Sequence, residues 1–213
     1  MNLIDGQRFL KEKKFDKSLK IFLYLEKKNC SDPRIFFYLG LIYFELNQFD
    51  KSISYYKKFL IKNPSSTNAL LNLAIVKQSI GKIDYAKKIY LKLIKKNKLN
   101  VKAYYGLYLL DPKNFAQKNF EILKNIEKDN KLNLHDLSLI NFLLSKEKKN
   151  QKKIKEQIEY LKKFHKNILN SNLYYNNSSQ FYYEKIIKKN FNKIKIINKN
   201  YFNLKTTDIE PIF

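Results

Sequence analysis

The chain of 213 residues has a single cysteine, Cys30, no tryptophan, and only four glycines and four prolines. One cysteine excludes an internal disulfide framework. No apolar run approaches the roughly 20 residues that a membrane-spanning helix needs. The first residues, MNLIDGQRFLKEKKFD, lack an uninterrupted apolar core, which argues against a secretory signal. These absences predict a cytoplasmic protein with no membrane contact.

Residue types that serve catalysis and metal binding are also scarce. The two histidines, His135 and His165, have no cysteine or carboxylate near them at the spacing of metal ligands. Cys30 has no base near it in sequence that would make it a nucleophile. Glu156 and Glu159 lie among lysines, as on a solvated helix face. We therefore expect no catalytic, metal or cofactor site in this chain.

Arginine is scarce too, although the chain is strongly basic. The net charge is +24, and the basic residues are 41 lysines and only two arginines, Arg8 and Arg34. Proteins that read nucleic-acid sequence usually use arginine for bidentate contacts to bases. An AT-rich genome encodes proteins that are rich in Lys, Asn, Ile, Tyr and Phe, as this chain is. Codon composition therefore explains the lysine excess. We expect weak, salt-sensitive and non-specific adhesion to polyanions. A basic polyanion- or nucleic-acid-binding module is one alternative function.

What the sequence does contain is a repeat, with a period of about 34 residues that is typical of stacked helical hairpins. Four columns of similar residues coincide when the chain is shifted by this period. They are Phe15, Phe49 and Ile83; Asp16, Asp50 and Asp84; Ser18, Ser52 and Ala86; and Phe22, Tyr56 and Tyr90. In addition, Leu39 aligns with Leu73, and Gly40 aligns with Gly6 and Ala74.

Small residues at two fixed places indicate how such hairpins pack. Gly40 and Ser52 fall where the two helices of a hairpin are expected to cross, and a larger side chain there would hold the helices apart. Gly81 can adopt positive φ in a turn, and Pro64 ends a second helix. The expected packing residues are Phe36, Leu39, Gly40, Tyr43, Ser52 and Tyr56 in one unit, and Leu73, Ala74, Ala86 and Tyr90 in the next.

This pattern resembles the tetratricopeptide repeat (TPR). The signature of that family has an aromatic residue, Leu-Gly and Tyr on a first helix, then a small residue, an aromatic residue and Pro on a second. The resemblance implies an all-α fold, a right-handed TPR helical-hairpin solenoid with a C-terminal helical extension. The units fall at about 1–32, 33–66 and 67–100, and a fourth unit begins at 101. An unrelated amphipathic helical bundle is the alternative.

The period ends in the second half of the chain. We expect a TPR array at 1–110, a degenerate repeat and helical extension or cap at 111–204, and a linker into a missing domain at 205–213. Asp111-Pro112 should end a helix, because the residue before Pro is pushed out of the α region. A further helix is expected at about 114–128. Later apolar stripes comprise Leu137, Ile140 and Leu144; Ile154, Ile158, Leu161, Phe164 and Ile168; and Phe181, Ile186 and Ile187.

In the TPR family, the first helices of the units line a concave surface that binds partners. The residues of this chain that match groove positions are Arg34, Phe37, Leu41, Phe44, Glu45, Asn68, Leu71, Ile75 and Gln78. Phe37 and Leu41 occupy the places where chaperone-tail binders of the family have Lys and Asn, so we expect no carboxylate clamp. An apolar groove suits an amphipathic helix or an extended apolar segment. Alternatively, the chain's own C-terminal helices fill the groove.

Residues 101–213 resemble a more specific arrangement. They contain AYYGLYLLD, LNLHDLSLINFLLSK, a Lys-rich segment, YYNNSSQFYYEKIIKKNF and a final PIF. This order resembles the region that joins repeats to enzyme in bacterial TPR–sulfotransferase proteins. There, Pro-Ile-Phe opens the first strand of the sulfotransferase domain, and a Gly- and Ser-rich loop then cradles the 5′-phosphate of the sulfate donor. No glycine follows Gly106 here, so we expect no such loop and no enzymatic activity in this chain.

These features together predict a protein–protein interaction scaffold. The resemblance makes it the targeting or docking half of a TPR-sulfotransferase that lacks its catalytic domain. The expected partner is a protein or peptide segment, and a sulfotransferase domain is one such partner. A free-standing TPR adaptor is the other alternative function.

Overall fold

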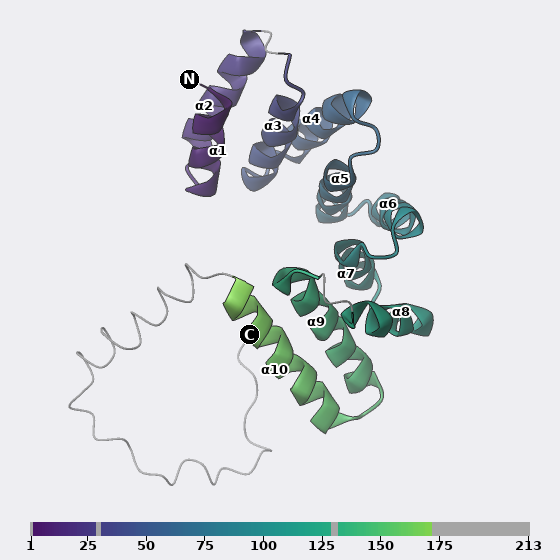
Figure 1. The fold of residues 1–213 in the computed structure, drawn as a ribbon. Coiled ribbons are helices and arrows are strands. Elements are labelled where there is room, and N and C mark those ends of the chain that lie inside the picture. The colour runs from purple at the N-terminus through teal and green to yellow at the C-terminus, as the bar shows by residue number, and fades with distance from the viewer. Residues whose placement is uncertain (1, 29–30, 129–131, 172–213) are drawn as a thin grey trace, which may run out of the picture.

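The computed structural model describes residues 2–28, 31–128 and 132–171, and every regular element in these ranges is an α-helix (Figure 1). The predicted all-α solenoid is therefore confirmed. The helices are α1 (Leu3–Lys11), α2 (Phe15–Lys27), α3 (Arg34–Glu45), α4 (Phe49–Lys62), α5 (Thr67–Ser79), α6 (Ile83–Lys96), α7 (Val101–Leu110), α8 (Gln117–Glu127), α9 (Leu134–Asn150) and α10 (Ile154–Ser171).

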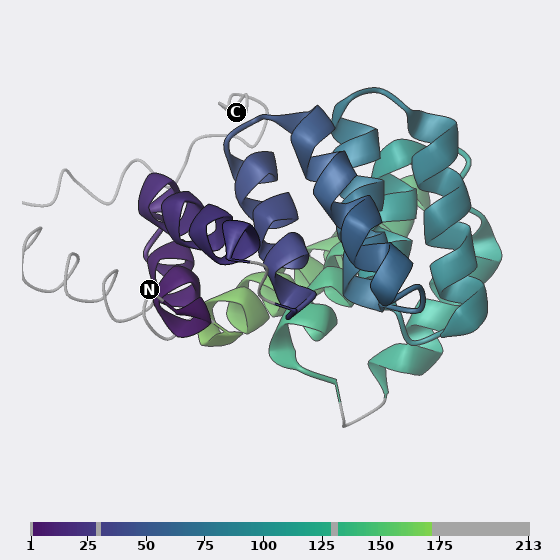
Figure 2. The same ribbon diagram turned by 90° about the horizontal axis from the view of Figure 1, so that it is seen from above.

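The helices follow one another along a curve and pair as hairpins. α1 packs on α2, α3 on α4 and α5 on α6, and each hairpin contacts the next (Figures 1 and 2). Figure 1 shows α3, α5 and α7 along the inner side of the curve, with α4, α6 and α8 along the outer side. At the far end, α9 packs on α7, α8 and α10. The inner face is therefore built from the first helix of successive units.

The turn inside each hairpin has the same backbone geometry. Lys13, Asn47 and Gly81, which lie one period apart, have φ values of 56°, 58° and 76°. In each turn the N–H of the following residue donates to the carbonyl oxygen five residues before it, at 2.8–2.9 Å. A residue in the left-handed conformation thus ends the first helix of each hairpin, and the turn provides hydrogen-bond donors for carbonyl groups that have no partner within the helix. Positive φ at Gly81 was predicted, whereas at Lys13 and Asn47 it was not.

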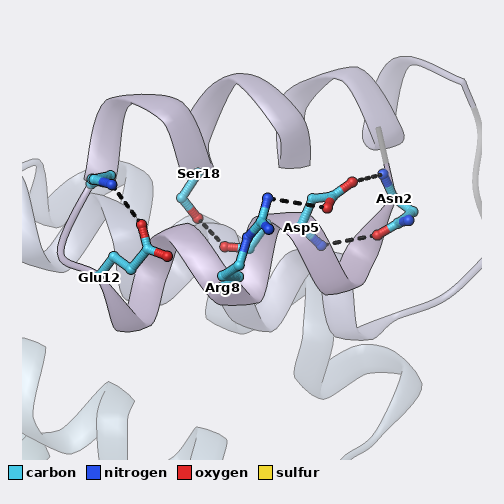
Figure 3. Close-up of polar contacts among 7 residues, drawn as sticks. Asn2, Asp5, Arg8, Glu12 and Ser18 are labelled. Carbon is cyan, nitrogen blue, oxygen red and sulfur yellow. Dashed lines mark hydrogen bonds and ion pairs between the residues drawn. The ribbon is translucent and has the colours of Figure 1, made fainter.

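Figure 3 shows the polar contacts that hold the first hairpin together. The Asn2 side chain caps α1 by accepting the backbone N–H of Asp5 at 2.9 Å, and the Asp5 carboxylate accepts the backbone N–H of Asn2. Such a capping box satisfies N–H groups that have no partner inside the helix. From α2, the Ser18 hydroxyl donates to the carbonyl oxygen of Gly6 at 2.8 Å. This bond ties the two helices of the hairpin to each other.

The second hairpin repeats that tie one period later. The Ser52 hydroxyl donates to the carbonyl oxygen of Gly40 at 2.7 Å. A Cβ atom on Gly40 would lie 2.9 Å from the nearest atoms of the Tyr56 ring, closer than packed carbon atoms approach. Glycine at this place therefore lets the tyrosine ring lie directly against α3. The Tyr56 ring thus gives a physical reason for a small residue at this helix crossing.

Nine of the ten predicted packing residues are buried; they are Leu39, Gly40, Tyr43, Ser52, Tyr56, Leu73, Ala74, Ala86 and Tyr90. Phe36 is only half-buried. Its ring stacks on that of Tyr55 with centroids 6.3 Å apart, and the Nζ atom of Lys58 lies 5.6 Å from its centroid. Ile35 and Ile42 are buried on the same helix, although the repeat pattern did not single them out.

The fourth unit departs from the hairpin geometry of the earlier units, because α8 packs on α9. α7 ends at Leu110, just before Asp111-Pro112, and α8 covers most of the segment expected at 114–128. The turn from α9 to α10 returns to the motif of the earlier units, with Lys152 at φ 58°. α9 and α10 therefore form one more hairpin, although their sequence no longer follows the period.

The last helix is less covered than its apolar stripe suggested. No residue of α10 is buried, and Ile154 and Ile158 are 67% and 46% exposed. Phe164 packs against Phe142 of α9 with ring centroids 5.6 Å apart. None of the helices in the described ranges is both long and apolar enough to span a bilayer. The expected helix around Phe181, Ile186 and Ile187, and the linker at 205–213, lie outside these ranges.

Candidate binding groove on the inner face

An apolar hollow of about 620 Å³ lies on the inner face, between α5, α7 and α9. We refer to it as the inner hollow. Its apolar lining comprises Leu71 and Ile75 from α5, Tyr105 and Leu109 from α7, and Leu139 from α9. Ile75 and Leu109 are 37% and 45% exposed, so the hollow is open to solvent. Large aliphatic side chains exposed in a concavity are typical of a binding surface.

Polar side chains border the same hollow. Lys102 at the start of α7 is exposed, and the His135 side chain on α9 is 52% exposed. The Gln78 side-chain oxygen accepts the Tyr90 hydroxyl at 3.0 Å, which fixes the amide at the rim. His135 Nδ1 lies 3.7 Å from the carboxylate of Asp136. The lining of the hollow thus includes two basic side chains, Lys102 and His135, and no carboxylate.

The part of the lining formed by Tyr90 and Gly106 depends on a close approach between α6 and α7. A Cβ atom on Gly106 would overlap the Tyr90 ring, so only glycine lets that ring meet α7. One unit earlier, the Asn72 side-chain amide donates to the Tyr56 hydroxyl at 3.1 Å from the equivalent place. Asn72 lies one period before Gly106. It therefore contacts the tyrosine of α4, just as Gly106 contacts the tyrosine of α6.

Three of the nine predicted groove residues, Leu71, Ile75 and Gln78, line the inner hollow together. Another three, Arg34, Phe37 and Asn68, line a smaller hollow of about 190 Å³ between α3 and α5. The remaining three, Leu41, Phe44 and Glu45, line neither hollow. Arg34 is engaged locally, because its guanidinium pairs with Asp32 at 2.6 Å. Six of the nine predicted groove residues are thus divided between two hollows, and the other three lie outside both.

Two of the predicted groove residues on α3 are packed rather than open. Phe37 is half-buried, and its ring centroid lies 5.9 Å from that of Tyr56 and 5.5 Å from that of Phe59. Phe44 is half-buried against Phe49 with centroids 5.9 Å apart. We expected these rings on an open face opposite the packed one, but α4 covers part of both faces of α3.

The alternative that C-terminal helices fill the groove can be followed as far as α10, the last described helix. α9 reaches the inner hollow, but its residues His135 and Leu139 form one wall of it. Ile75 and Leu109 on the facing helices keep their exposure. Within the described ranges, the C-terminal extension therefore lengthens the groove and leaves it open.

The predicted groove ended at α5 and did not include the residues of α7 that line the hollow, although the period could have placed them there. Moving the groove positions of α5 forward by one period takes Asn68 to Lys102, Leu71 to Tyr105 and Ile75 to Leu109. All three lie on the inner hollow. His135 and Leu139 had no such signal, because α9 lies beyond the periodic part of the chain.

Other clusters of polar residues serve the fold. Glu147 on α9 is 1% exposed and accepts hydrogen bonds from Gln117 at 2.7 Å and Lys124 at 2.8 Å. This buried acceptor fixes α8 against α9, because an unpaired carboxylate there would be costly. His135 and His165 lie on different helices, and among the described residues no three His, Cys, Asp or Glu side chains are grouped to hold a metal ion.

Comparison with known proteins agrees with this architecture. Residues 33–66 and 68–98 each match a family model described as a tetratricopeptide repeat. No curated protein matches the chain. A crystal structure of MamA is 19% identical over 82% of this chain and 99% of that chain, with a TM-score of 0.55. A tetratricopeptide repeat protein from Parabacteroides merdae is 20% identical over 76% of this chain and 62% of that one, with a TM-score of 0.58.

A third solved structure, MamA from Desulfovibrio magneticus, is 17% identical over 76% of this chain and 89% of its own, with a TM-score of 0.55. At such identities the likeness concerns the fold alone. The two matched repeats correspond to α3–α4 and α5–α6, which are the units that the period placed at 33–66 and 67–100. The chain therefore carries tetratricopeptide repeats in a solenoid of the tetratricopeptide type.

Proposed function

We propose that the protein is a protein-interaction scaffold whose inner hollow binds a segment of a partner protein. The observation that carries this proposal is the exposure of Ile75 and Leu109 in one concavity lined by three successive inner helices. A solenoid of repeats presents such a concave surface to its ligands. Burying these side chains under a partner removes apolar area from water, which favours association.

A finer proposal concerns the partner. The resemblance of residues 101–213 to the joining region of TPR–sulfotransferase proteins supports a docking or targeting role beside a sulfotransferase domain. α7, α9 and α10 correspond to the first three segments of that resemblance, whereas its later segments lie outside the described ranges. Sequencing the DNA after the codon for Phe213 tests this proposal. A reading frame there for a Gly-rich strand–loop–helix supports it, and its absence favours a free-standing adaptor.

A polyanion-binding role has less support. Lysines lie on every described helix except α3, and the lining of the inner hollow contributes one lysine, Lys102. Such a spread gives a diffuse positive potential rather than a phosphate-tracking groove. The cytoplasmic location stays a prediction from the sequence.

The binding role is tested by placing negative charges at two apolar positions that line the hollow. Peptides are selected on the parent protein from a random display library, and their affinities are then measured for a double variant, Ile75→Asp with Leu109→Asp. Both side chains are exposed, so the variant should keep the melting temperature of the parent. Ile61→Asp on α4, where Ile61 is 81% exposed, is the matched control.

We expect the double variant to lose the selected peptides and the control to keep them. Retention of every peptide by a folded double variant would show that binding does not use the inner hollow.

A further inference from the structure

We infer that the inner hollow recognises an internal segment of a partner protein in which a large apolar side chain lies next to an acidic one. The apolar side chain enters the hollow, and the carboxylate faces Lys102 and His135. This inference rests on the proposed function, because it specifies the chemistry of the segment that the hollow would bind.

The charge of the lining supports an acidic partner. Lys102 on α7 and His135 on α9 line the hollow, and the residues that line it include no Asp or Glu. Within residues 2–28, 31–128 and 132–171, Lys102 forms no ion pair. Its ammonium group is therefore available to a carboxylate from outside. A lining that combines basic and apolar side chains complements a segment that carries an acidic and an apolar side chain.

The acidic group next to His135 has partners at the start of its own helix. One carboxylate oxygen of Asp136 accepts the Asn133 side-chain amide at 2.8 Å in the first turn of α9, and the other lies 3.7 Å from His135 Nδ1. A carboxylate in a first turn is stabilised by the helix dipole. Asp136 thus satisfies the start of α9 and does not line the hollow, so Lys102 has no acidic neighbour in the lining.

The position of the hollow favours an internal segment over a chain terminus. α5, α7 and α9 line it in succession, and α5 also contributes Asn68 to the smaller hollow beside α3. A segment that passes over α5 can therefore contact residues of both hollows. Four large aliphatic side chains line the hollow, namely Leu71, Ile75, Leu109 and Leu139. The Tyr105 ring in the lining packs edge-on against Phe142 of α9, so the lining is mainly aliphatic and is not the series of free aromatic platforms on which nucleic-acid bases stack.

The test uses synthetic peptides with blocked ends. Peptides of about 12 residues that bind the parent are taken from the display selection, because such a length spans several inner-helix positions. Each is made with an acetylated amino end and an amidated carboxyl end, in three versions. One version keeps its acidic residues, one replaces them by Gln or Asn, and one replaces them by Lys. Fluorescence anisotropy at physiological ionic strength gives the affinities, since surface attraction at longer range is then screened.

We expect the acidic version to bind about tenfold more tightly than the amide version, as is usual when a charge-assisted hydrogen bond is lost. Lys102→Glu should abolish this preference and make the Lys version the tighter ligand. Lys92→Glu is the matched control. Lys92 is exposed on α6 and does not line the hollow, so this substitution changes the charge by the same amount at a different place. It should leave the preference in place.

Each other outcome has a defined meaning. Equal affinity for acidic and amide versions, with both lost in Ile75→Asp/Leu109→Asp, overturns this inference and leaves the proposed function standing. Equal weakening by Lys92→Glu and Lys102→Glu overturns it in favour of diffuse attraction. Binding that requires a free carboxyl end overturns the internal segment. Displacement of the acidic peptide by an unrelated oligonucleotide at the same salt overturns the choice of a protein partner. Peptides that bind the folded Ile75→Asp/Leu109→Asp variant as well as the parent overturn the proposed function itself.

Discussion

The Nζ atom of Lys77 lies 5.2 Å from the centroid of the Tyr85 ring, and the preceding hairpin has the same pair with the two residue types exchanged. There, the Nζ atom of Lys51 lies 5.2 Å from the centroid of the Tyr43 ring. In both hairpins the pair joins the end of the first helix to the start of the second, at the same separation along the chain. A cation over an aromatic face thus closes the hairpin whichever helix provides the cation.

This contact matters most for Lys77, which is 8% exposed. Burial and the nearby ammonium groups of Lys82 and Lys57 lower the pKa of Lys77. The negative face of the Tyr85 ring offsets part of the cost of holding that charge away from water. In the first hairpin, the Nζ atom of Lys17 lies 5.8 Å from the centroid of the Phe9 ring at the equivalent places.

A double-mutant cycle of Lys77→Met and Tyr85→Leu should therefore show coupling of about 0.5–2 kcal/mol in the free energy of unfolding. Methionine keeps much of the lysine stem, so the cycle isolates the contact between charge and ring. Urea unfolding of the parent, both single variants and the double variant gives the coupling. If the two single effects simply add, the contact contributes nothing and the exchanged pair is a coincidence.

The repeat period predicted the packing of the hairpins because that packing depends on fixed sequence places. Gly40 must be small for the Tyr56 ring to meet α3, and Ser52 must be small beside it. Comparing residue types at equivalent positions could not predict the exchanged pairs, because Lys77 lies at the position where the preceding unit has Tyr43. The residue type at this position changes from tyrosine to lysine, but the cation–aromatic contact with the next helix is kept.

The inner face was less predictable than the hairpin packing, for a related reason. A residue opposite the packed stripe of a helix can be open or covered, depending on how far the neighbouring second helix reaches round it. Phe37 and Ile75 occupy inner positions on successive first helices, yet Phe37 packs on Tyr56 and Phe59, whereas Ile75 is exposed in the hollow. The repeat pattern places both on the inner side and does not distinguish them.

A second prediction concerns the serine that ties the second hairpin. Ser52→Leu should lower the free energy of unfolding by about 2–4 kcal/mol, because it overpacks a fully buried site and leaves the Gly40 carbonyl without its 2.7 Å bond. Ser54→Leu is the control, since Ser54 is exposed two residues along the same helix. It should change stability by less than about 0.5 kcal/mol.

Ser52→Ala separates the two roles of that serine. The third unit has Ala86 in this column, so alanine fits in volume, and the loss of the hydrogen bond alone should cost about 1 kcal/mol. Chemical unfolding measures all three variants. A Ser52→Leu variant as stable as Ser54→Leu would mean that α3 and α4 do not cross at this serine.

A third prediction concerns the turn after α1. Lys13 has φ of 56°, a region that costs a non-glycine residue about 1–2 kcal/mol, whereas glycine loses about 0.5–1 kcal/mol in backbone entropy. Lys13→Gly should therefore raise the melting temperature by about 1–4 °C. Lys20→Gly, at an exposed place inside α2, is the control and should lower it, because glycine weakens a helix interior. Scanning calorimetry that finds both variants destabilised would argue against the turn geometry.

A fourth prediction follows from Glu127 at the end of α8. Burial raises the pKa of Glu127, and attraction to Lys163 only partly opposes this shift. The folded protein thus holds this proton more tightly than the unfolded chain, so the stability contributed by Glu127 falls as pH rises from about 4.5 through the raised pKa. A negative charge at a helix C-terminus is also unfavourable, by about 0.3–1 kcal/mol.

Glu127→Gln should therefore melt at a higher temperature than the parent at pH 7, and the difference should vanish at pH values below the normal carboxyl pKa. Glu121→Gln, at an exposed place on the same helix, should show no comparable pH-dependent gain. Thermal melts of the three proteins across an acid-to-neutral series provide the measurement. A lower melting temperature for Glu127→Gln than for the parent at pH 7 would mean that the pair with Lys163 outweighs the cost of burial.

The last prediction separates the packed part of the inner face from its open part. Phe37→Ser should lower the free energy of unfolding by about 2–4 kcal/mol, because the Phe37 ring packs on the rings of Tyr56 and Phe59 at 5.9 and 5.5 Å. Leu109→Ser removes a side chain that is 45% exposed in the inner hollow and should cost less than about 1 kcal/mol. Urea unfolding curves of both variants test the contrast. Equal stability of the two variants would mean that the Phe37 ring is not packed against α4. Phe37 would then be open to partners, as the sequence led us to expect, and the groove would extend to α3.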